Sequence, residues 1–278
     1  SNTMLASKPA MKFLSDIGCK EPDQLDHIIN HVLTKYQDAE AEFPEDEMLE
    51  DFVLLLKYYK TASLEARESL VEKAGQMFSI GVKTNSGEVA ALHPCEVYLD
   101  TDDLKSYFRG NNEVYFFDNV FYKSVLREFG RKLVNEFLEN IGILTMPQVT
   151  SSVYHDESCL SKAQKDQLGY TYTTRYRTIT DFNIQGLKGA IAHIAEKPDA
   201  LSFWRLISSI PVKDYVSAIY KYFYRTDLIK HFESSALVML KSKPWIVIDG
   251  KLYRPKDVSL EQFVDARYPV NYELCEIL

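Results

Sequence analysis

The chain repeats two of its own sequence patterns in the same order. A Phe-Leu-x-x-Ile-Gly pattern at 13–18 returns at 137–142. A glycine-containing turn that leads into Pro-x-acid-Val-x-Leu occupies 87–99 and returns at 250–260. Such echoes are typical of tandem units built from one supersecondary module. The sequence therefore predicts an α+β, predominantly helical fold of two tandem related units, each with a helical body and a small β-hairpin.

The expected boundary between the units falls just before the second copy of the first pattern. The first unit then spans 1–136 and the second spans 137–278. Two turn signals between short apolar runs, Asn85-Ser86-Gly87-Glu88 and Asp249-Gly250, predict the hairpins. The expected β segments are a hairpin near 82–99, a strand near 170–180 and a hairpin near 245–254.

Helices are expected where apolar residues recur at helical spacing, with Ser63 and Thr101 as N-caps. The expected helical ranges are 9–17, 22–36, 48–59, 63–78, 101–108, 120–141 with a break near Gly130, 161–168, 184–195, 199–207 and 226–240. Residues 143–154 fit a loop or a strand. The aromatic stretch 212–224 fits either a helix or a strand.

Composition narrows the classes of function. The net charge of -8 provides no global field that would attract nucleic acid. The four cysteines lie far apart, which fits a reducing cytoplasm rather than a zinc site or a redox dithiol. No apolar run is long enough to span a membrane and no signal peptide is visible. We therefore expect a cytoplasmic protein without a membrane or cofactor partner; the start at Ser1-Asn2 suggests a tag remnant on a piece of a longer protein.

One aromatic and basic segment offers a nucleic-acid-binding hypothesis. Its residues are Tyr170, Tyr172, Arg175, Tyr176 and Arg177. In a strand the tyrosines share one face and the arginines the other, so bases could stack on tyrosine while arginine meets phosphate. The same pattern also fits an ordinary half-buried strand with tyrosine inward and arginine outward.

His27 and His31 lie four residues apart on an expected helix, a spacing that can hold a metal ion between two imidazoles. No third ligand is obvious, so the alternative is two polar residues on an exposed helical face. The run His155 to Cys159 contains nucleophile and base types, but a triad needs groups that the fold brings together. A polar loop explains that run, and no catalytic residue is predicted.

A family resemblance rests on motifs in the second half of the chain. The segment Trp245 to Val258 resembles the tryptophan, hairpin and Asp-Gly-Lys segment of large sacsin-like proteins. The segments 203–207, 222–225 and 232–237 are similar to their leucine-tryptophan, aromatic-Arg and Glu-Ser-Ser helices. The hairpin at 84–99 matches the same pattern in the first half.

The resemblance implies a middle or C-terminal region of a bacterial protein that contains a GHKL-type ATPase domain. The motifs of that ATPase domain are missing from this chain, so no ATP-site residue is carried over. The expected function is a non-catalytic structural or interaction module whose partner is the ATPase domain of the parent chain or another protein. The alternative is a nucleic-acid-binding module that uses the Tyr/Arg strand 170–177.

Overall fold

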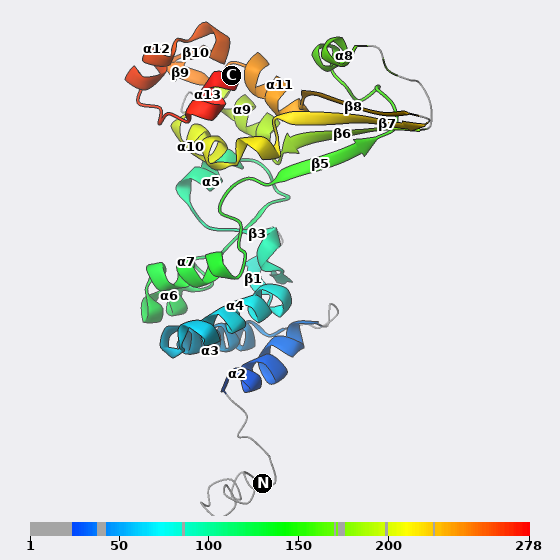
Figure 1. The fold of residues 1–278 in the computed structure, drawn as a ribbon. Helices are drawn as coiled ribbons and strands as arrows, with labels where there is room; N and C mark the ends of the chain where they lie inside the picture. The colour runs from blue at the N-terminus through cyan, green and yellow to red at the C-terminus, as the bar shows by residue number, and fades with distance from the viewer. Residues whose placement is uncertain are drawn as a thin grey trace, which may run out of the picture. The chain divides into compact units, whose positions relative to one another are not determined.

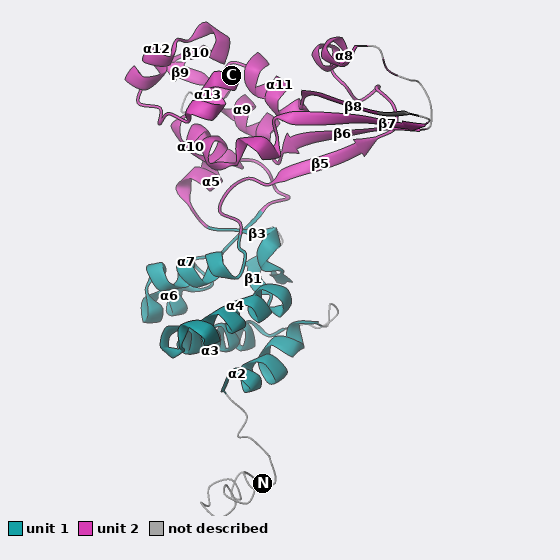
Figure 2. Cartoon of the chain, in the orientation of Figure 1, with its two compact units in different colours: residues 1–99, 115–143 teal, residues 100–114, 144–278 magenta. Residues whose placement is uncertain are grey.

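The computed structural model describes residues 24–37, 43–84, 87–169, 171, 176–197, 200–224 and 226–278. About half of these residues are helical and the rest include several small sheets, so the fold is a mixed α+β fold, as expected. The chain forms two compact units, in which 1–99 combines with 115–143, and 100–114 combines with 144–278 (Figure 2). This division differs from the expected one, because the chain passes between the units three times.

Unit 1 is mainly helical (Figure 1). Its elements are α2 (Gln24–His27), η1 (Ile28–Val32), η2 (Leu33–Gln37), α3 (Glu45–Thr61), α4 (Leu64–Met77), β1 (Ile80–Lys83), β2 (Val89–Leu92), η3 (Pro94–Glu96), β3 (Val97–Tyr98), β4 (Tyr115–Phe116), α6 (Lys123–Phe129) and α7 (Arg131–Asn140). The expected cap at Ser63 is confirmed, since its hydroxyl accepts a hydrogen bond from the N–H of Ala66. The expected break near Gly130 separates α6 from α7.

Aromatic rings fill the core of unit 1. Phe52 of α3 contacts the rings of Phe78, Phe117, Tyr122 and Phe137. The hydroxyl of the fully buried Tyr122 accepts a hydrogen bond of 2.9 Å from a backbone N–H in β1. Burial raises the pKa of this phenol. The hydrogen bond links the β1-β2 hairpin to the start of α6.

Unit 2 contains the largest sheet. Its elements are α5 (Asp102–Tyr107), β5 (Val149–Tyr154), α8 (Lys162–Leu168), β6 (Arg177–Ile184), α9 (Leu187–Glu196), α10 (Leu201–Ser209), η4 (Val212–Asp214), β7 (Ser217–Tyr224), β8 (Thr226–Glu233), α11 (Ser235–Ser242), β9 (Ile246–Ile248), β10 (Lys251–Tyr253), η5 (Pro255–Asp257), α12 (Leu260–Asp265) and α13 (Tyr272–Ile277). The sheet has the strand order β5-β6-β7-β8 and is antiparallel throughout (Figure 1).

The two faces of this sheet differ in their packing. On the covered face, side chains of β6, β7 and β8 pack with Leu160 and Leu168, the latter in α8. Those side chains are Ile179, Ala218, Tyr220, Tyr222 and Phe232. On the open face, most of the alternate residues are half-buried or exposed, and Val153, Phe223 and Ile229 remain 60%, 54% and 57% exposed. The sheet therefore follows the period of two expected of a half-buried antiparallel sheet.

The expected helix at 226–240 is wrong. Its first part is β8, which pairs with β7 over the register Ser217↔Glu233 to Tyr224↔Thr226. The apolar residues of this segment recur at a spacing that fits a helix. Leu228 and Phe232 also fit a strand that buries every second side chain. Helix α11 begins only after Ser234, whose hydroxyl caps it by accepting from the N–H of Leu237.

The second echo corresponds to a shared local structure. In both places a two-stranded hairpin is followed by a 3-10 turn that begins at proline, η3 after β1-β2 and η5 after β9-β10. The first copy of the other echo, at 13–18, lies outside the described residues. Among the described residues the four-stranded sheet occurs in unit 2 alone. The structure thus shows matching hairpins and turns, without showing that the two units are related as wholes.

Candidate functional site

The described end of the candidate Tyr/Arg segment, Tyr176 and Arg177, lies at the start of β6. Residues Tyr170, Tyr172 and Arg175 lie outside the described residues, while Tyr176 and Arg177 are described. The strand begins at Arg177, so within the described residues it is shorter than the expected range near 170–180.

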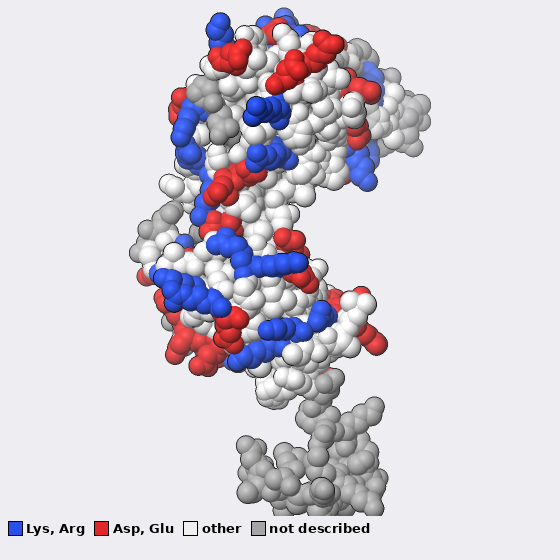
Figure 3. All heavy atoms as spheres, turned by 90° about the vertical axis from the view of Figure 1, so that its left-hand side faces the viewer, with Lys and Arg blue, Asp and Glu red and all other residues white. Residues whose placement is uncertain are grey.

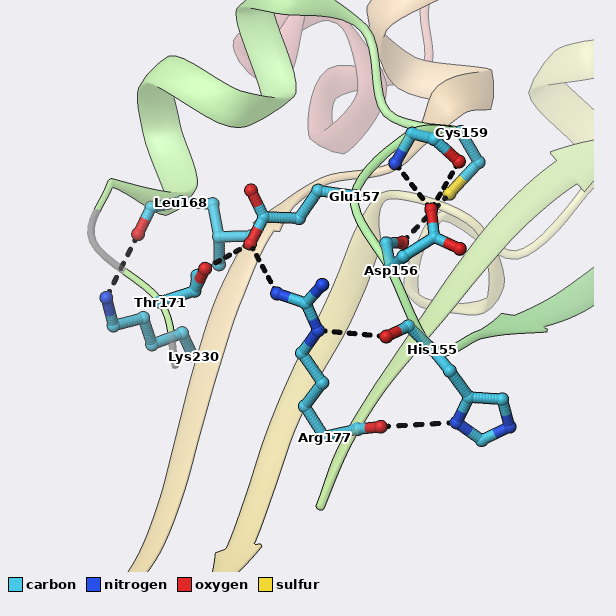
Figure 4. Close-up of polar contacts among 9 residues, drawn as sticks. His155, Asp156, Glu157, Cys159, Leu168, Thr171, Arg177 and Lys230 are labelled. Atoms are coloured by element: carbon cyan, nitrogen blue, oxygen red, sulfur yellow. Dashed lines mark hydrogen bonds and ion pairs between the residues drawn. The ribbon is translucent and has the colours of Figure 1, made fainter. Parts of the chain in front are cut away.

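Arg177 is engaged in a polar cluster beside α8 (Figure 4). Its Nη1 lies 3.0 Å from Glu157 Oε1, and its Nε donates a 2.9 Å hydrogen bond to the carbonyl oxygen of His155. The hydroxyl of Thr171 donates to the same carboxylate oxygen of Glu157. The Arg177 side chain is 10% exposed and that of Glu157 is 28% exposed. The charge of Arg177 is therefore balanced inside the protein and is poorly placed to meet a phosphate.

Tyr176 belongs to an aromatic cluster at the end of β7. Its ring stacks on Tyr224 at a centroid distance of 4.5 Å and an interplanar angle of 14°. It meets Phe223 edge-on at 6.1 Å. Phe223 and Tyr224 both remain partly open to solvent. Two rings of this cluster are thus partly exposed beside the ion-paired Arg177.

The run from His155 to Cys159 folds as a turn held by its own polar groups (Figure 4). Hydrogen bonds from the side chain and the N–H of Ser158 lower the pKa of Asp156. The Nδ1 of His155 faces the carbonyl oxygen of Arg177 at 3.2 Å, and the thiol of Cys159 donates to the carbonyl oxygen of Asp156. Burial raises the pKa of that thiol, which reduces the thiolate available at neutral pH. Among the described residues, no hydrogen bond links His155 to Cys159 or to an acidic side chain, so the turn does not pair a nucleophile with a base.

His27 and His31 lie side by side in unit 1. Their ring centroids are 4.8 Å apart with the planes tilted by 45°, and both residues are exposed. Within the described part of the chain, no group of three or more His, Cys, Asp or Glu side chains is arranged to hold a metal ion. The two imidazoles alone offer an incomplete ligand set, so metal binding here stays a prediction.

A polar network at the junction of β8 and α11 was not anticipated from the sequence. The buried carboxylate of Asp181 accepts from both the N–H and the hydroxyl of Ser235, at the start of α11. The amide of the buried Gln164 donates to the carbonyl oxygen of Glu233, which joins α8 to the edge of β8. Lys241 pairs with Glu233 at 2.6 Å. The Ser161-x-x-Gln164 capping box could have been recognised in the sequence. The contact of Gln164 with β8 could not, because Glu233 is distant in the sequence.

Surface charge shows no large area of one sign on the face drawn in Figure 3. Lys and Arg side chains lie there among Asp and Glu side chains in both units. Nucleic-acid-binding surfaces usually gather basic residues on one face or along one helix. None of the described helices is both long and apolar enough to cross a bilayer.

No protein-family model matches the chain, and neither a curated protein nor a solved structure is similar to it. The polar groups of the described cluster bond to one another, while apolar side chains on the open face of the sheet remain without cover.

Proposed function

We propose that this chain is a non-catalytic interaction module of a larger sacsin-like protein, and that it binds the ATPase domain of that protein. The observation that carries the proposal is the open face of the β5-β6-β7-β8 sheet, with Val153, Phe223 and Ile229 each more than half exposed. The proposed family rests on the resemblance of the motifs at 245–258 and 84–99, and the repeated hairpin with its proline turn supports a modular architecture.

The exposed apolar side chains are large enough to matter for binding. Covering a half-exposed aliphatic or aromatic side chain contributes on the order of 1 kcal/mol. Three such residues on one face then contribute about 3 kcal/mol, which corresponds to roughly a hundredfold in affinity. The polar candidates, in contrast, already have partners within the chain, as Arg177 has in Glu157. The open face is therefore the stronger candidate for a binding surface.

The test measures binding of the purified ATPase domain of the parent protein to this chain by biolayer interferometry. The paired substitution Phe223→Ser with Ile229→Ser is expected to weaken binding at least tenfold. The matched control is Leu64→Ser, because Leu64 is 74% exposed but lies in unit 1. Equal affinity of the paired variant and the wild type, or no binding by the wild type, overturns the proposal. Phosphate release from ATP by this chain alone is expected to stay at the buffer level.

The alternative is a module that binds single-stranded nucleic acid through the aromatic cluster of Tyr176, Phe223 and Tyr224. Partly exposed rings at the end of a sheet offer base-stacking positions. A mobility-shift assay with a single-stranded oligonucleotide at low salt tests it. Retardation that is lost on Tyr224→Ala supports this function, and no retardation at micromolar protein removes it.

A further inference from the structure

Strand β5 forms an edge of the sheet without the usual protection. Within the described residues it pairs with β6 alone, in a continuous register from Val149↔Ile184 to Tyr154↔Ile179. It contains no charged residue, no proline and no bulge, and its four central residues are exposed. Edge strands are normally protected by charge, proline, a bulge or short length, because their free N–H and C=O groups attract another strand. This edge is therefore suited to strand pairing.

The hydrogen-bonding pattern between β5 and β6 determines which N–H and C=O groups of β5 point toward the free edge. The N–H of Gln185 donates to the carbonyl oxygen of Gln148, so these two residues form a hydrogen-bonded pair. Hydrogen-bonded and non-hydrogen-bonded pairs alternate along antiparallel strands. The residues that bond to β6 are thus Thr150, Ser152 and Tyr154, and the residues whose N–H and C=O face the free edge are Val149, Ser151 and Val153.

The edge-facing residues are symmetric about Ser151. An antiparallel second copy related by a two-fold axis through Ser151 places Ser151 opposite itself and Val149 opposite Val153. Every edge-facing N–H and C=O of these three residues then meets a complementary group, as an isologous interface requires. All three side chains lie on the open face, so the open faces of both copies remain on the same side of a continuous sheet.

Charge does not oppose a second copy at this position, unlike on most of the surface. The whole chain carries a net charge of -8, which disfavours contact between copies over most surfaces. The β5 strand is free of acidic and basic side chains, so the paired strands bring no like charges together. A single pair of short strands buries less than about 1,200 Å², which is the range of weak, transient interfaces.

We propose that two copies of this chain associate through β5, antiparallel, with the two-fold axis at Ser151. The association does not depend on the ATPase partner proposed above, because it uses the edge of the sheet and leaves Phe223 and Ile229 of the open face uncovered. Sedimentation velocity over a series of protein concentrations is expected to show a reversible monomer–dimer equilibrium. A wild-type chain that stays monomeric at several hundred micromolar overturns the proposal.

Substitutions at the edge separate this interface from any other. Ser151→Pro removes an N–H that β6 does not use, so it is expected to weaken the dimer at least tenfold without lowering the melting temperature. Ser151→Lys places like charges on the two-fold axis and is expected to act in the same direction. The matched control is Ile229→Lys, an equal change of charge on the opposite edge strand, which should leave the dimer intact. Dimerisation that survives both Ser151 substitutions overturns the assignment to β5.

A charge-pairing experiment tests the register. Val149→Lys combined with Val153→Glu opposes unlike charges across the two-fold axis and should preserve the dimer. Val149→Lys combined with Val153→Lys opposes like charges and should abolish it. Equal dimerisation of the two double variants contradicts the register. All measurements use the full chain without any ATPase domain, so the result is independent of the proposed function.

Discussion

The guanidinium of Arg177 holds together three segments that are separate in the sequence. It stands on β6, bonds to the backbone of the turn at His155, and pairs with Glu157, which also accepts from Thr171. A short sequence pattern of tyrosine and arginine suggested ligand binding, because an isolated pattern does not reveal the acid that will neutralise the cation. The fold supplies that acid from a neighbouring turn.

Loss of the Arg177 charge is expected to destabilise unit 2. Arg177→Met leaves Glu157 partly buried without its partner, which costs about 3 kcal/mol in the free energy of unfolding measured with urea. Arg205→Met is the matched control, because its 3.3 Å pair with Asp103 is more exposed and worth less than about 1 kcal/mol. Adding Glu157→Leu to Arg177→Met should recover most of the loss. Equal costs for the two arginine substitutions contradict the structural role.

Two glycines of α9 should respond in opposite ways to alanine. Gly186 precedes the helix with φ at +75°, and a Cβ there would lie 2.8 Å from the Phe108 ring, so Gly186→Ala should cost about 2 kcal/mol. Gly189 lies inside the helix with open space around it, so Gly189→Ala should stabilise by about 0.5 to 1 kcal/mol. Thermal and urea unfolding of both variants measures the difference; the same sign for both contradicts this packing.

At the scale of elements, helices and hairpins were predictable where neighbouring residues determine the structure. Capped helices such as α4, α5 and α8 were identified from Ser63, Thr101 and the 161–168 pattern, because a cap and its target lie three residues apart. The β9-β10 hairpin was identified from Asp249-Gly250, which adopts the left-handed backbone that such turns need. Strand β8 was missed because its state is decided by pairing with β7, and a segment alternating in burial can also match helical spacing.

The candidate site was predictable only in part for the same reason. The sequence singled out Arg177 and the turn 155–159, and the structure brings them together. It gave no indication that Glu157 would neutralise Arg177, that Asp181 would bond to the start of α11, or which face of the sheet would stay open. These are contacts between distant segments, and they follow from strand register rather than from local composition.

The junction of β8 with α11 gives a pH-dependent prediction. Burial alone would raise the pKa of Glu233, but hydrogen bonds from Lys241 and Gln167 outweigh it and lower that pKa below its ordinary value. A carboxylate with a lowered folded-state pKa contributes stability above its unfolded pKa of about 4.3, and this contribution is lost as pH falls through the folded pKa. Glu233→Gln should therefore be less stable than the wild type at pH 7, with the difference disappearing in acid.

Urea unfolding at a series of pH values from 7 downward measures this effect. The control is Glu261→Gln, since Glu261 is an exposed acid of α12 with no ion-pair partner among the described residues. Its stability should follow that of the wild type at every pH. A Glu233→Gln variant with a constant stability difference across the series would show that the carboxylate charge is not responsible.

At the scale of the whole molecule, α5 belongs to a unit that is discontinuous in the sequence. It is part of unit 2 although it precedes β4, α6 and α7 of unit 1. Its Leu104 and Tyr107 are buried, as is Phe108 directly after the helix, and the Tyr107 ring stacks on Phe203 of α10 at 6.0 Å. Unit 2 therefore needs residues 100–114, which are separated from the rest of the unit by residues 115–143 of unit 1.

A fragment of residues 144–278 should accordingly be incomplete. Without α5 it exposes apolar surface on α9 and α10, so its melting temperature should lie at least about 10 °C below that of a fragment that also carries 100–114 through a flexible linker. Circular dichroism of the two fragments measures the difference. Indistinguishable melting curves would contradict the discontinuous unit.

The three crossings of the chain between units have a consequence for synthesis on the ribosome. Unit 1 has all of its residues once the chain reaches 143, whereas α5 must wait for α9 and α10. The partner helices emerge about a hundred residues later, a delay of roughly 5 to 20 s at usual elongation rates. During that interval the apolar side of a short helix stays in water on the nascent chain. A chaperone that shields these side chains at this stage would increase the yield of folded protein. It would bind side chains that are buried once the protein has folded.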